Sequence, residues 1–298
     1  MAEADISLYN MSHLDVGYKM QRRPRGLALI FNNERFHHLN ERTGTQRDER
    51  ELDTTFKKLG FVVKLCNDYT ASEIRGTLLK ASNFDHSNFD CFLCVFLTHG
   101  DDGIIYGSDG DPESFKGNGN VHSTNRTWLR LNDDVFDIFR GNNCDKLIGK
   151  PKIFIIQACR GGKAEIPATE IRAPTKYSEI AEGVNVTIPT EADFLICYSS
   201  SEGYYSIREL FAGTWFIQDL NRVLNEFGNN ADFIQLLTVV NRLVSERTVR
   251  GFGKLEEIKQ MPCFLSKLTK QLRFDDQQPE ADSPKAEKKG CCNRCRCC

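Results

Sequence analysis

The sequence from residue 90 to residue 100 is DCFLCVFLTHG, and the sequence from residue 152 to residue 161 is KIFIIQACRG. Both stretches begin with a short run of almost continuously apolar, aromatic or β-branched residues, which is typical of strands that are covered on both faces. The same pattern recurs in residues 26–31, 61–65 and 193–198. These runs predict five buried strands.

Amphipathic stretches between and after these runs predict helices, because their apolar residues recur at spacings of three or four. The apolar positions are Leu52, Phe56 and Leu59; Ile74, Leu78 and Ala81; Phe216, Leu220, Val223 and Phe227; and Phe233, Leu237, Val240 and Val244. Gly60 and Gly228 are predicted to end helices, and Thr70 with Glu73 forms a capping-box signal. Strands that alternate with helices indicate an α/β fold with a mostly parallel sheet and helices on both faces.

The composition narrows the classes of function. Of the 298 residues, 40% are hydrophobic and 27% are charged, so the chain has enough apolar material for a folded core. The 39 Lys and Arg against 41 Asp and Glu give a net charge of −2, which argues against a general nucleic-acid binder. The sequence has no apolar run of transmembrane length, no secretory signal and no glycine-rich phosphate-binding loop. We therefore expect a cytoplasmic protein that is not a doubly wound nucleotide binder.

Three stretches lack the strand and helix patterns. Residues 108–126 are polar and rich in Gly and Asn, so we expect a long surface loop. Residues 161–189 have no sustained period and contain three prolines, so they separate an N-terminal block from a C-terminal block. Residues 275–298 form a charged tail that is not expected to pack.

The two opening stretches end in side chains that can do chemistry. His99 follows the first run and Cys159 follows the second, and the carboxyl ends of parallel strands meet at one edge of a sheet. A cysteine thiolate is a nucleophile, and a nearby imidazole can favour it and protonate a leaving amine. The N–H groups of Gly100 and Cys159 could stabilise a developing oxyanion. The alternative is that Cys159 is a structural thiol of the core and His99 a residue of a turn. Their positions at two strand ends, each beside a glycine, favour the catalytic interpretation.

The pentapeptide Gln157-Ala158-Cys159-Arg160-Gly161 resembles the sequence around the nucleophile of caspases. Further segments resemble caspase segments in the same order: Arg42-Thr43-Gly44-Thr45, Thr98-His99-Gly100, Gly149-Lys150-Pro151-Lys152, Ala192-Asp193-Phe194-Leu195, Gly203-Tyr204-Tyr205-Ser206 and Met261-Pro262-Cys263. The similarity spans residues 6–274 and is closest to the short-prodomain executioner caspases of animals.

The resemblance implies a caspase-like α/β fold with a mostly parallel six-stranded sheet and helices on both faces. It also implies how the chain is divided. The implied parts are a short prosegment at 1–17, a large-subunit block at 18–163, a linker at 164–188, a small-subunit block at 189–274 and a disordered basic, Cys-rich tail at 275–298.

Roles for single residues follow from the same resemblance. Cys159 would be the nucleophile, His99 the general acid and base, and the N–H groups of Gly100 and Cys159 the oxyanion hole. Caspases cleave after aspartate, and the residues that hold its carboxylate match Arg42, Gln157 and Arg208. A guanidinium binds a carboxylate through two parallel hydrogen bonds, although a single arginine is more often a solvated surface charge. Further substrate contacts match Tyr205, Ser206, Ile207, Glu209 and Trp215. Of these, Ser206, together with Arg208, would pair with the substrate main chain as an added strand.

Two of these positions depart from the family pattern. Ile207 stands where tryptophan is usual, so the second and fourth subsites should differ in shape. Glu209 stands where executioners often have asparagine, and its carboxylate would repel an acidic side chain in the fourth subsite. We therefore predict a weaker preference for Asp there. Trp215 matches the family's other subsite aromatic, with a core tryptophan as the alternative.

Caspases are zymogens that are cut between their two blocks, usually after aspartate, yet no aspartate lies between Cys159 and Ala192. The candidate cut sites there are Glu165, Glu170, Glu179 and Glu182. Cleavage after one of these glutamates, cleavage by an unrelated upstream protease, and activity of the uncut chain through dimerisation all remain open. Asp15 is a candidate cut site for the prosegment, which we expect to be too short for a recruitment domain.

Of the 12 cysteines, seven lie between Cys66 and Cys263 and five lie in the final CCNRCRCC. The five terminal cysteines lie beside a run of basic residues, which suggests lipid anchoring. Cys297 and Cys298 are the candidates for prenylation, and Cys291 or Cys292 for palmitoylation. The alternatives are a small metal clip and exposed thiols without a role. We favour lipidation, which would hold a cytoplasmic chain at a membrane surface, and we expect no metal and no cofactor. Cys91 and Cys94 lie in a predicted strand, where positions three apart face opposite sides.

The favoured function is that of a homodimeric cysteine endopeptidase that cleaves proteins after aspartate and executes programmed cell death. An upstream activating protease and inhibitor proteins would be its further partners. The alternative is a catalytically silent caspase homologue that binds and regulates other caspases. The retained Cys159, His99, Arg42, Gln157 and Arg208 argue against this alternative.

Overall fold

A six-stranded sheet forms the centre of the computed structural model, which describes residues 17–116, 126–162, 190–249 and 257–275. The spatial order of its strands is β11-β8-β7-β3-β1-β2. Their bounds are β1 Gly26–Asn32, β2 Phe61–Asn67, β3 Cys91–Leu97, β7 Lys152–Gln157, β8 Phe194–Tyr198 and β11 Cys263–Ser266. All neighbouring pairs are parallel except β11 and β8, which are antiparallel. The five predicted strands and the mostly parallel α/β fold are confirmed.

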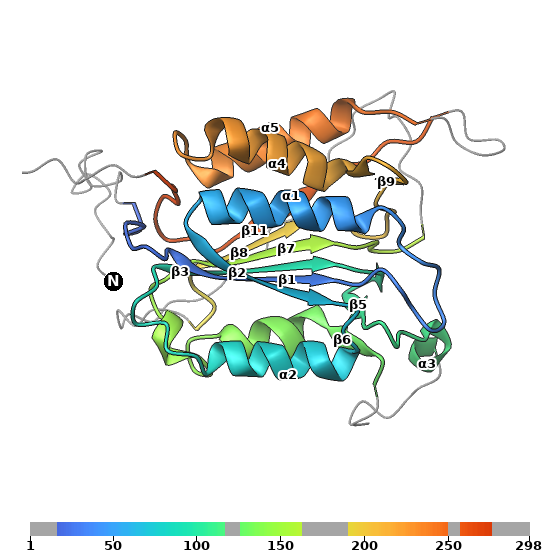
Figure 1. Ribbon diagram of the computed structural model, residues 1–298, viewed down its shortest axis with the longest axis horizontal. Coiled ribbons are helices and arrows are strands. Elements are labelled where there is room, and N and C mark those ends of the chain that lie inside the picture. The colour runs from blue at the N-terminus through green and yellow to red at the C-terminus, as the bar shows by residue number, and fades with distance from the viewer. Residues whose placement is uncertain (1–16, 117–125, 163–189, 250–256, 276–298) are drawn as a thin grey trace, which may run out of the picture.

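Helices cover both faces of this sheet (Figure 1). On one face lie α1 Thr45–Lys58, α4 Trp215–Phe227 and α5 Phe233–Glu246. On the other face α2 Ala71–Ser82 packs with short helical turns over Leu131–Phe136, Asp137–Phe139 and Asp145–Leu147. The described residues therefore form two main apolar cores, one on each face of the sheet.

Strand β3 shows how one continuous apolar run serves both cores. Cys91, Leu93, Val95 and Leu97 belong to the core under α1, α4 and α5, whereas Phe92, Cys94 and Phe96 belong to the core against α2. Cys91 and Cys94 are both fully buried and lie on opposite faces, as predicted. Burial raises the pKa of each thiol far above its ordinary value, so both stay neutral.

The helix boundaries follow most of the sequence signals. The Thr70 hydroxyl accepts a hydrogen bond from the Glu73 N–H at 3.3 Å, and the Glu73 carboxylate accepts one from the Thr70 N–H at 2.9 Å, so the capping box is confirmed. Helix α1 ends just before Gly60, whose φ of 86° lies in the region that favours glycine. The inward placement of Phe227 is wrong: 42% of its surface is exposed, because it ends α4 beyond the edge of the core.

Three parts of the fold differ from, or go beyond, the sequence-based expectation. Strand β11 was not found from its residues, because it is only four residues long and partly exposed at the sheet edge. Residues 108–126 are not loop throughout: they contain the short helix α3 Pro112–Lys116. The short helical turns within residues 131–147 carry buried side chains although no regular period marks them.

Two small sheets lie at the end of the main sheet where the parallel strands finish (Figure 1). One contains β4 Gly100–Asp101, β5 Ile104–Tyr106 and β6 Trp128–Arg130. The other is a hairpin of β9 Arg208–Glu209 and β10 Gly213–Thr214. Both stand beside the candidate active site.

Candidate active site

Adjacent parallel strands bring His99 and Cys159 to the same edge of the sheet. Strands β3 and β7 pair in parallel with Leu97 opposite Gln157, and His99 and Cys159 each lie two residues beyond these partners. The Thr98 N–H donates to the Gln157 carbonyl at 3.2 Å, which continues the pairing beyond the strand ends. The register therefore places the two residues at the same edge of the sheet, as the sequence predicts.

Gly100 packs directly against the segment that carries Cys159. A Cβ atom at Gly100 would lie 2.9 Å from the Ala158 Cβ and 3.0 Å from the Cys159 carbonyl oxygen. Any larger side chain would push these two segments apart, so the backbone can come this close only at a glycine. Cys159 itself is a free, half-buried thiol.

The environment of His99 fixes its protonation. Its Nε2 lies 2.8 Å from the Asn40 carbonyl oxygen, and a carbonyl can only accept, so Nε2 carries the hydrogen and Nδ1 is the free basic nitrogen. The Phe36 ring packs edge-on against the imidazole, with centroids 4.7 Å apart. Burial lowers the pKa of His99 to about 4, against the Asn40 hydrogen bond, which raises it. The imidazole is therefore neutral at neutral pH and can accept a proton.

Two arginines lie near this pair. Arg42 is buried, and its guanidinium donates to the Asn33 carbonyl at 3.2 Å and to the Thr45 hydroxyl at 2.9 Å. Burial, helped by the like charge of nearby Arg208, lowers the pKa of Arg42 to about 9. Burial also lowers the pKa of Arg208. Both guanidinium groups remain protonated at neutral pH, so their mutual repulsion would be relieved by a bound anion.

Gln157 connects the end of β7 with the segment that precedes β9. Its Nε2 donates to the Ser206 hydroxyl at 2.5 Å, and its buried Oε1 accepts no hydrogen bond from the described residues. A buried amide oxygen without a partner is costly, so it marks a place where a donor from a ligand would be favourable.

The two blocks of the chain meet beside Cys159. The Gly203 N–H donates to the Arg160 carbonyl at 2.6 Å, and the Arg160 N–H donates to the Tyr204 carbonyl at 3.1 Å. Gly161 has a φ of 135°, and a Cβ there would lie 2.7 Å from the Gly203 Cα. The backbones of the two stretches around Cys159 and Gly203 are thus in direct contact.

The remaining predicted substrate contacts differ in exposure. Tyr205 is exposed, while Ile207 is half-buried against the core and donates its N–H to the Gln260 side-chain oxygen at 2.7 Å. Trp215 is only 3% exposed, and its indole Nε1 donates to the exposed Glu209 carboxylate at 2.7 Å. In this structure Trp215 is thus a core side chain whose polar edge holds Glu209.

Several predicted residues lie outside the described residues, so the structure does not place them. They are the candidate cut sites Asp15, Glu165, Glu170, Glu179 and Glu182, and the candidate lipidation sites Cys291, Cys292, Cys297 and Cys298. Over the part of the chain that is described, no helix is both long enough and apolar enough to cross a membrane.

Sequence reasoning missed two supports of the site. The Asn40 carbonyl that orients His99 is a backbone group, which no residue type marks. The buried carboxylate of Asp48 accepts hydrogen bonds from Thr214, opposite Arg208 in the hairpin. An acid inside an otherwise amphipathic helix gives only a faint signal, because most such acids are solvated.

Comparison with known proteins finds relatives that cover most of this chain. A model of the caspase domain matches residues 25–273. Caspase-6 of Mus musculus is 42% identical over 269 residues, which cover 86% of this chain and 91% of the relative. Caspase-3 of Oryctolagus cuniculus is 37% identical over 273 residues, with 90% of each chain covered. Caspase-7 of Gallus gallus is 38% identical over 263 residues, covering 86% of this chain and 79% of the relative.

Proposed function

The chain belongs to the caspase family, and from this premise we propose that it is a cysteine endopeptidase that cleaves proteins after aspartate. One observation carries the proposal: His99 and Cys159 follow Leu97 and Gln157, which are paired in adjacent parallel strands. The nearby Arg42 and Arg208 favour a substrate with a carboxylate at the cleavage position.

In the proposed acylation step, Nδ1 of the neutral His99 imidazole accepts the proton of the Cys159 thiol while the sulfur attacks the carbonyl carbon of the substrate aspartate. The carbonyl electron pair moves onto its oxygen, which accepts hydrogen bonds from the N–H groups of Gly100 and Cys159. When the carbonyl re-forms, the C–N bond breaks and the imidazolium proton passes to the leaving amine.

Hydrolysis of the thioester completes the cycle. His99 accepts a proton from a water molecule whose oxygen attacks the acyl carbon, and the C–S bond then breaks. The proton returns to the departing Cys159 sulfur, so the free enzyme is regenerated and the substrate is released as a carboxylic acid. No step requires a metal or an organic cofactor.

Hydrolysis of a fluorogenic peptide that ends in aspartate tests this proposal in the full-length chain. We expect Cys159→Ala and His99→Ala to lower kcat/KM by about a thousandfold or more, because each removes a member of one catalytic unit. Cys263→Ala is the matched control, since among the described free cysteines Cys263 is the other half-buried thiol. A peptide ending in asparagine should be cleaved far more slowly. A wild-type chain that binds other caspases but cleaves no aspartyl peptide would instead be a silent homologue.

We also propose that residues 18–163 and 189–274 act as large and small subunits joined by the linker 164–188, behind a prosegment at 1–17. Strands β7 and β8 lie on either side of the linker in sequence and are neighbours in the main sheet. A cut between them would therefore leave the core intact. Mass spectrometry of wild type and Cys159→Ala tests self-processing. A cut after a glutamate that vanishes in the variant supports it, whereas identical fragments in both chains, or no fragments, exclude it.

The wider biological role is proposed on the family premise alone: execution of programmed cell death in the cytoplasm, by a homodimer that an upstream protease activates and inhibitor proteins restrain.

We propose in addition that the terminal cysteines are lipidated. Replacing Cys291, Cys292, Cys297 and Cys298 by serine should move the chain from the detergent phase to the aqueous phase, because two lipid chains, or one with a basic patch, are needed for firm anchoring. Unchanged partitioning would exclude the anchor.

A further inference from the structure

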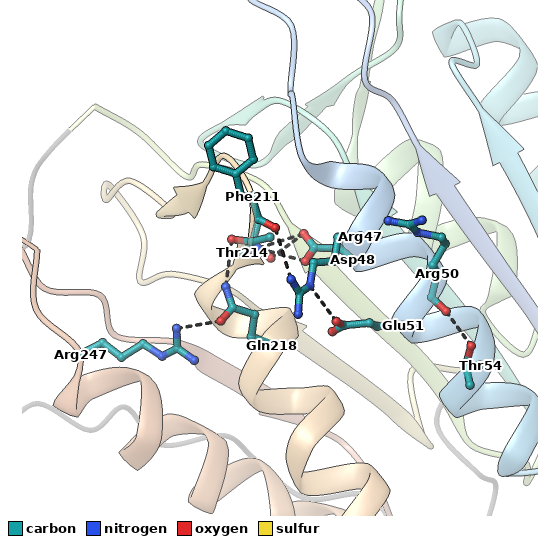
Figure 2. A network of polar contacts seen from close by, with 10 residues as sticks. Arg47, Asp48, Arg50, Glu51, Thr54, Phe211, Thr214, Gln218 and Arg247 are labelled. Carbon is teal, nitrogen blue, oxygen red and sulfur yellow. Dashed lines mark hydrogen bonds and ion pairs between the residues drawn. The ribbon is translucent and has the colours of Figure 1, made fainter.

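Asp48 is a fully buried acid in α1 that bonds to the C-terminal block. The Thr214 N–H donates to both oxygens of the Asp48 carboxylate, at 3.0 Å and 3.1 Å. The Thr214 hydroxyl donates to one of these oxygens at 2.9 Å. Figure 2 shows Thr214 against Asp48 at the start of α1, with the segment around Phe211 beside them. One carboxylate therefore satisfies both hydrogen-bond donors of a residue from the other block.

Thr214 is the residue of the hairpin that pairs with Arg208. In the β9–β10 register, Thr214 stands opposite Arg208 and Gly213 opposite Glu209. Gly213 has a φ of 89°, and a Cβ there would overlap the Asp48 carboxylate, so only glycine allows this approach. The acid thus holds the strand that lies directly across from one of the two aspartate-binding arginines.

A second contact from α1 reaches the turn of the same hairpin. The Arg47 guanidinium donates to the Phe211 carbonyl at 3.3 Å and to Glu51 at 2.9 Å. Gln218 of α4 donates to the Gly213 carbonyl at 3.1 Å (Figure 2). Of these hairpin contacts, only those of Asp48 are made by a buried ionised group, and hydrogen bonds to charged groups are the stronger ones.

The charge of Asp48 also acts on the substrate pocket. It favours the protonated guanidinium of both Arg42 and Arg208. Burial raises the pKa of Asp48 to about 6, against the Thr214 hydrogen bonds and the charge of Arg42, while Glu51 on the same helix raises it further. Glu34 acts on the same two arginines with the same sign as Asp48.

We propose that Asp48 is a positioning residue for the aspartate pocket: it fixes the β9–β10 hairpin on α1 and offsets the repulsion between Arg42 and Arg208, so that both arginines are in place before substrate binds. This inference rests on the proposed function. A pocket that is ordered in advance spends less of its binding free energy on ordering, so the effect belongs in KM and not in kcat.

The test compares Asp48→Asn with Asp53→Asn in the full-length chain. Asp53 lies in the same helix and pairs with Lys57 at 2.8 Å, away from the hairpin. For Asp48→Asn we expect KM for an aspartyl peptide to rise about five- to tenfold with kcat changed less than about twofold. Asp53→Asn should match wild type. Thr214→Val should raise KM as well, and Thr214→Ser, which keeps the hydroxyl, should restore it.

The pH profile separates positioning from a general loss of structure. Protonating Asp48 turns an acceptor oxygen into a donor, so the wild-type KM should rise as pH falls through about 6. Asp48→Asn should lack this rise. His99 titrates lower, at a pKa of about 4, and the substrate aspartate is ionised throughout this range. Equal KM profiles for wild type and Asp48→Asn would overturn the inference while leaving the protease function intact.

Hydrogen exchange gives a readout that does not need activity. In the Cys159→Ala background, Asp48→Asn should speed amide exchange in the 208–214 peptide, because the Thr214 N–H loses its charged acceptor, while exchange in β3 and β7 stays unchanged. An inactive wild type with this exchange pattern would refute the proposed function but not the anchoring. Unchanged exchange at 208–214 would refute the anchoring itself.

Discussion

The side-chain amide of Gln157 donates a hydrogen bond to the hydroxyl of Ser206, with 2.5 Å between Nε2 and Oγ. The two residues belong to different blocks of the chain: Gln157 ends β7, and Ser206 lies two residues before Arg208. The bond therefore ties the strand that leads to Cys159 to the segment that leads to Arg208. This one hydrogen bond therefore links the segment of the proposed nucleophile to a segment that carries a proposed carboxylate-binding residue.

A negative charge at Gln157 should disable the aspartate pocket. Gln157→Glu keeps the size of the side chain but adds a carboxylate near Arg42 and Arg208, which would compete with the substrate carboxylate. We expect kcat/KM for an aspartyl peptide to fall about a hundredfold or more. Gln157→Met removes the bond to Ser206 and the amide donor toward the substrate carboxylate but adds no charge, so it should cost less, about tenfold. Similar losses in both variants would contradict this account of the pocket.

The sequence predicted the strands well because each is a continuous apolar run, and the register then followed from parallel pairing. That Cys159 and His99 emerge at the same sheet edge requires only that two such strands be parallel neighbours. Contacts between polar residues that are far apart in the sequence produce no comparable sequence pattern. Asp48 and Thr214 are 166 positions apart, and neither is unusual for its own element. Arg42 could be assigned a role only through the family resemblance. Its role depends on its burial, and a single charged residue in a sequence does not indicate whether it is buried.

The partly buried imidazole of His99 should lower the stability of the folded chain in mild acid. Its pKa is lowered to about 4 in the folded chain, so the unfolded chain binds more protons between pH 6.5 and pH 4, and stability falls as pH falls through that range. Between pH 7 and pH 5 we expect wild type to lose about 1–2 kcal/mol relative to His99→Asn. Urea unfolding at the two pH values measures the difference.

The comparison with His99→Asn isolates one group. Asp48, whose pKa is raised to about 6, titrates in the same range with the opposite sign, but it is present in both proteins and cancels. His38→Asn, at an exposed position, serves as the control and should follow wild type. A His99→Asn variant that loses as much stability as wild type would show that the surroundings of the imidazole do not lower its pKa.

The fourth subsite should discriminate against aspartate through Glu209. The Glu209 carboxylate accepts a hydrogen bond from the Trp215 indole N–H at 2.7 Å, so its charge has a fixed place. Glu209→Gln keeps an acceptor for Trp215 and removes the charge. We expect it to raise kcat/KM about three- to tenfold for peptides with Asp four residues before the cut, and to leave peptides with Val there unchanged. A wild-type library profile that peaks at Asp in that position would overturn the prediction.

The exposed edge of β11 should carry the dimer contact. Among the described strands β11 is paired only with β8, and Leu265 in its centre is 49% exposed. An apolar edge strand of this kind favours pairing with a second copy around a two-fold axis. Leu265→Lys should raise the dimer dissociation constant at least about tenfold in sedimentation experiments, because a charge on an edge strand blocks such pairing. Val62→Lys is the matched control, since Val62 is 48% exposed on β2 at the opposite edge of the same sheet. If Val62→Lys dissociates the dimer and Leu265→Lys does not, the subunits associate through the other edge.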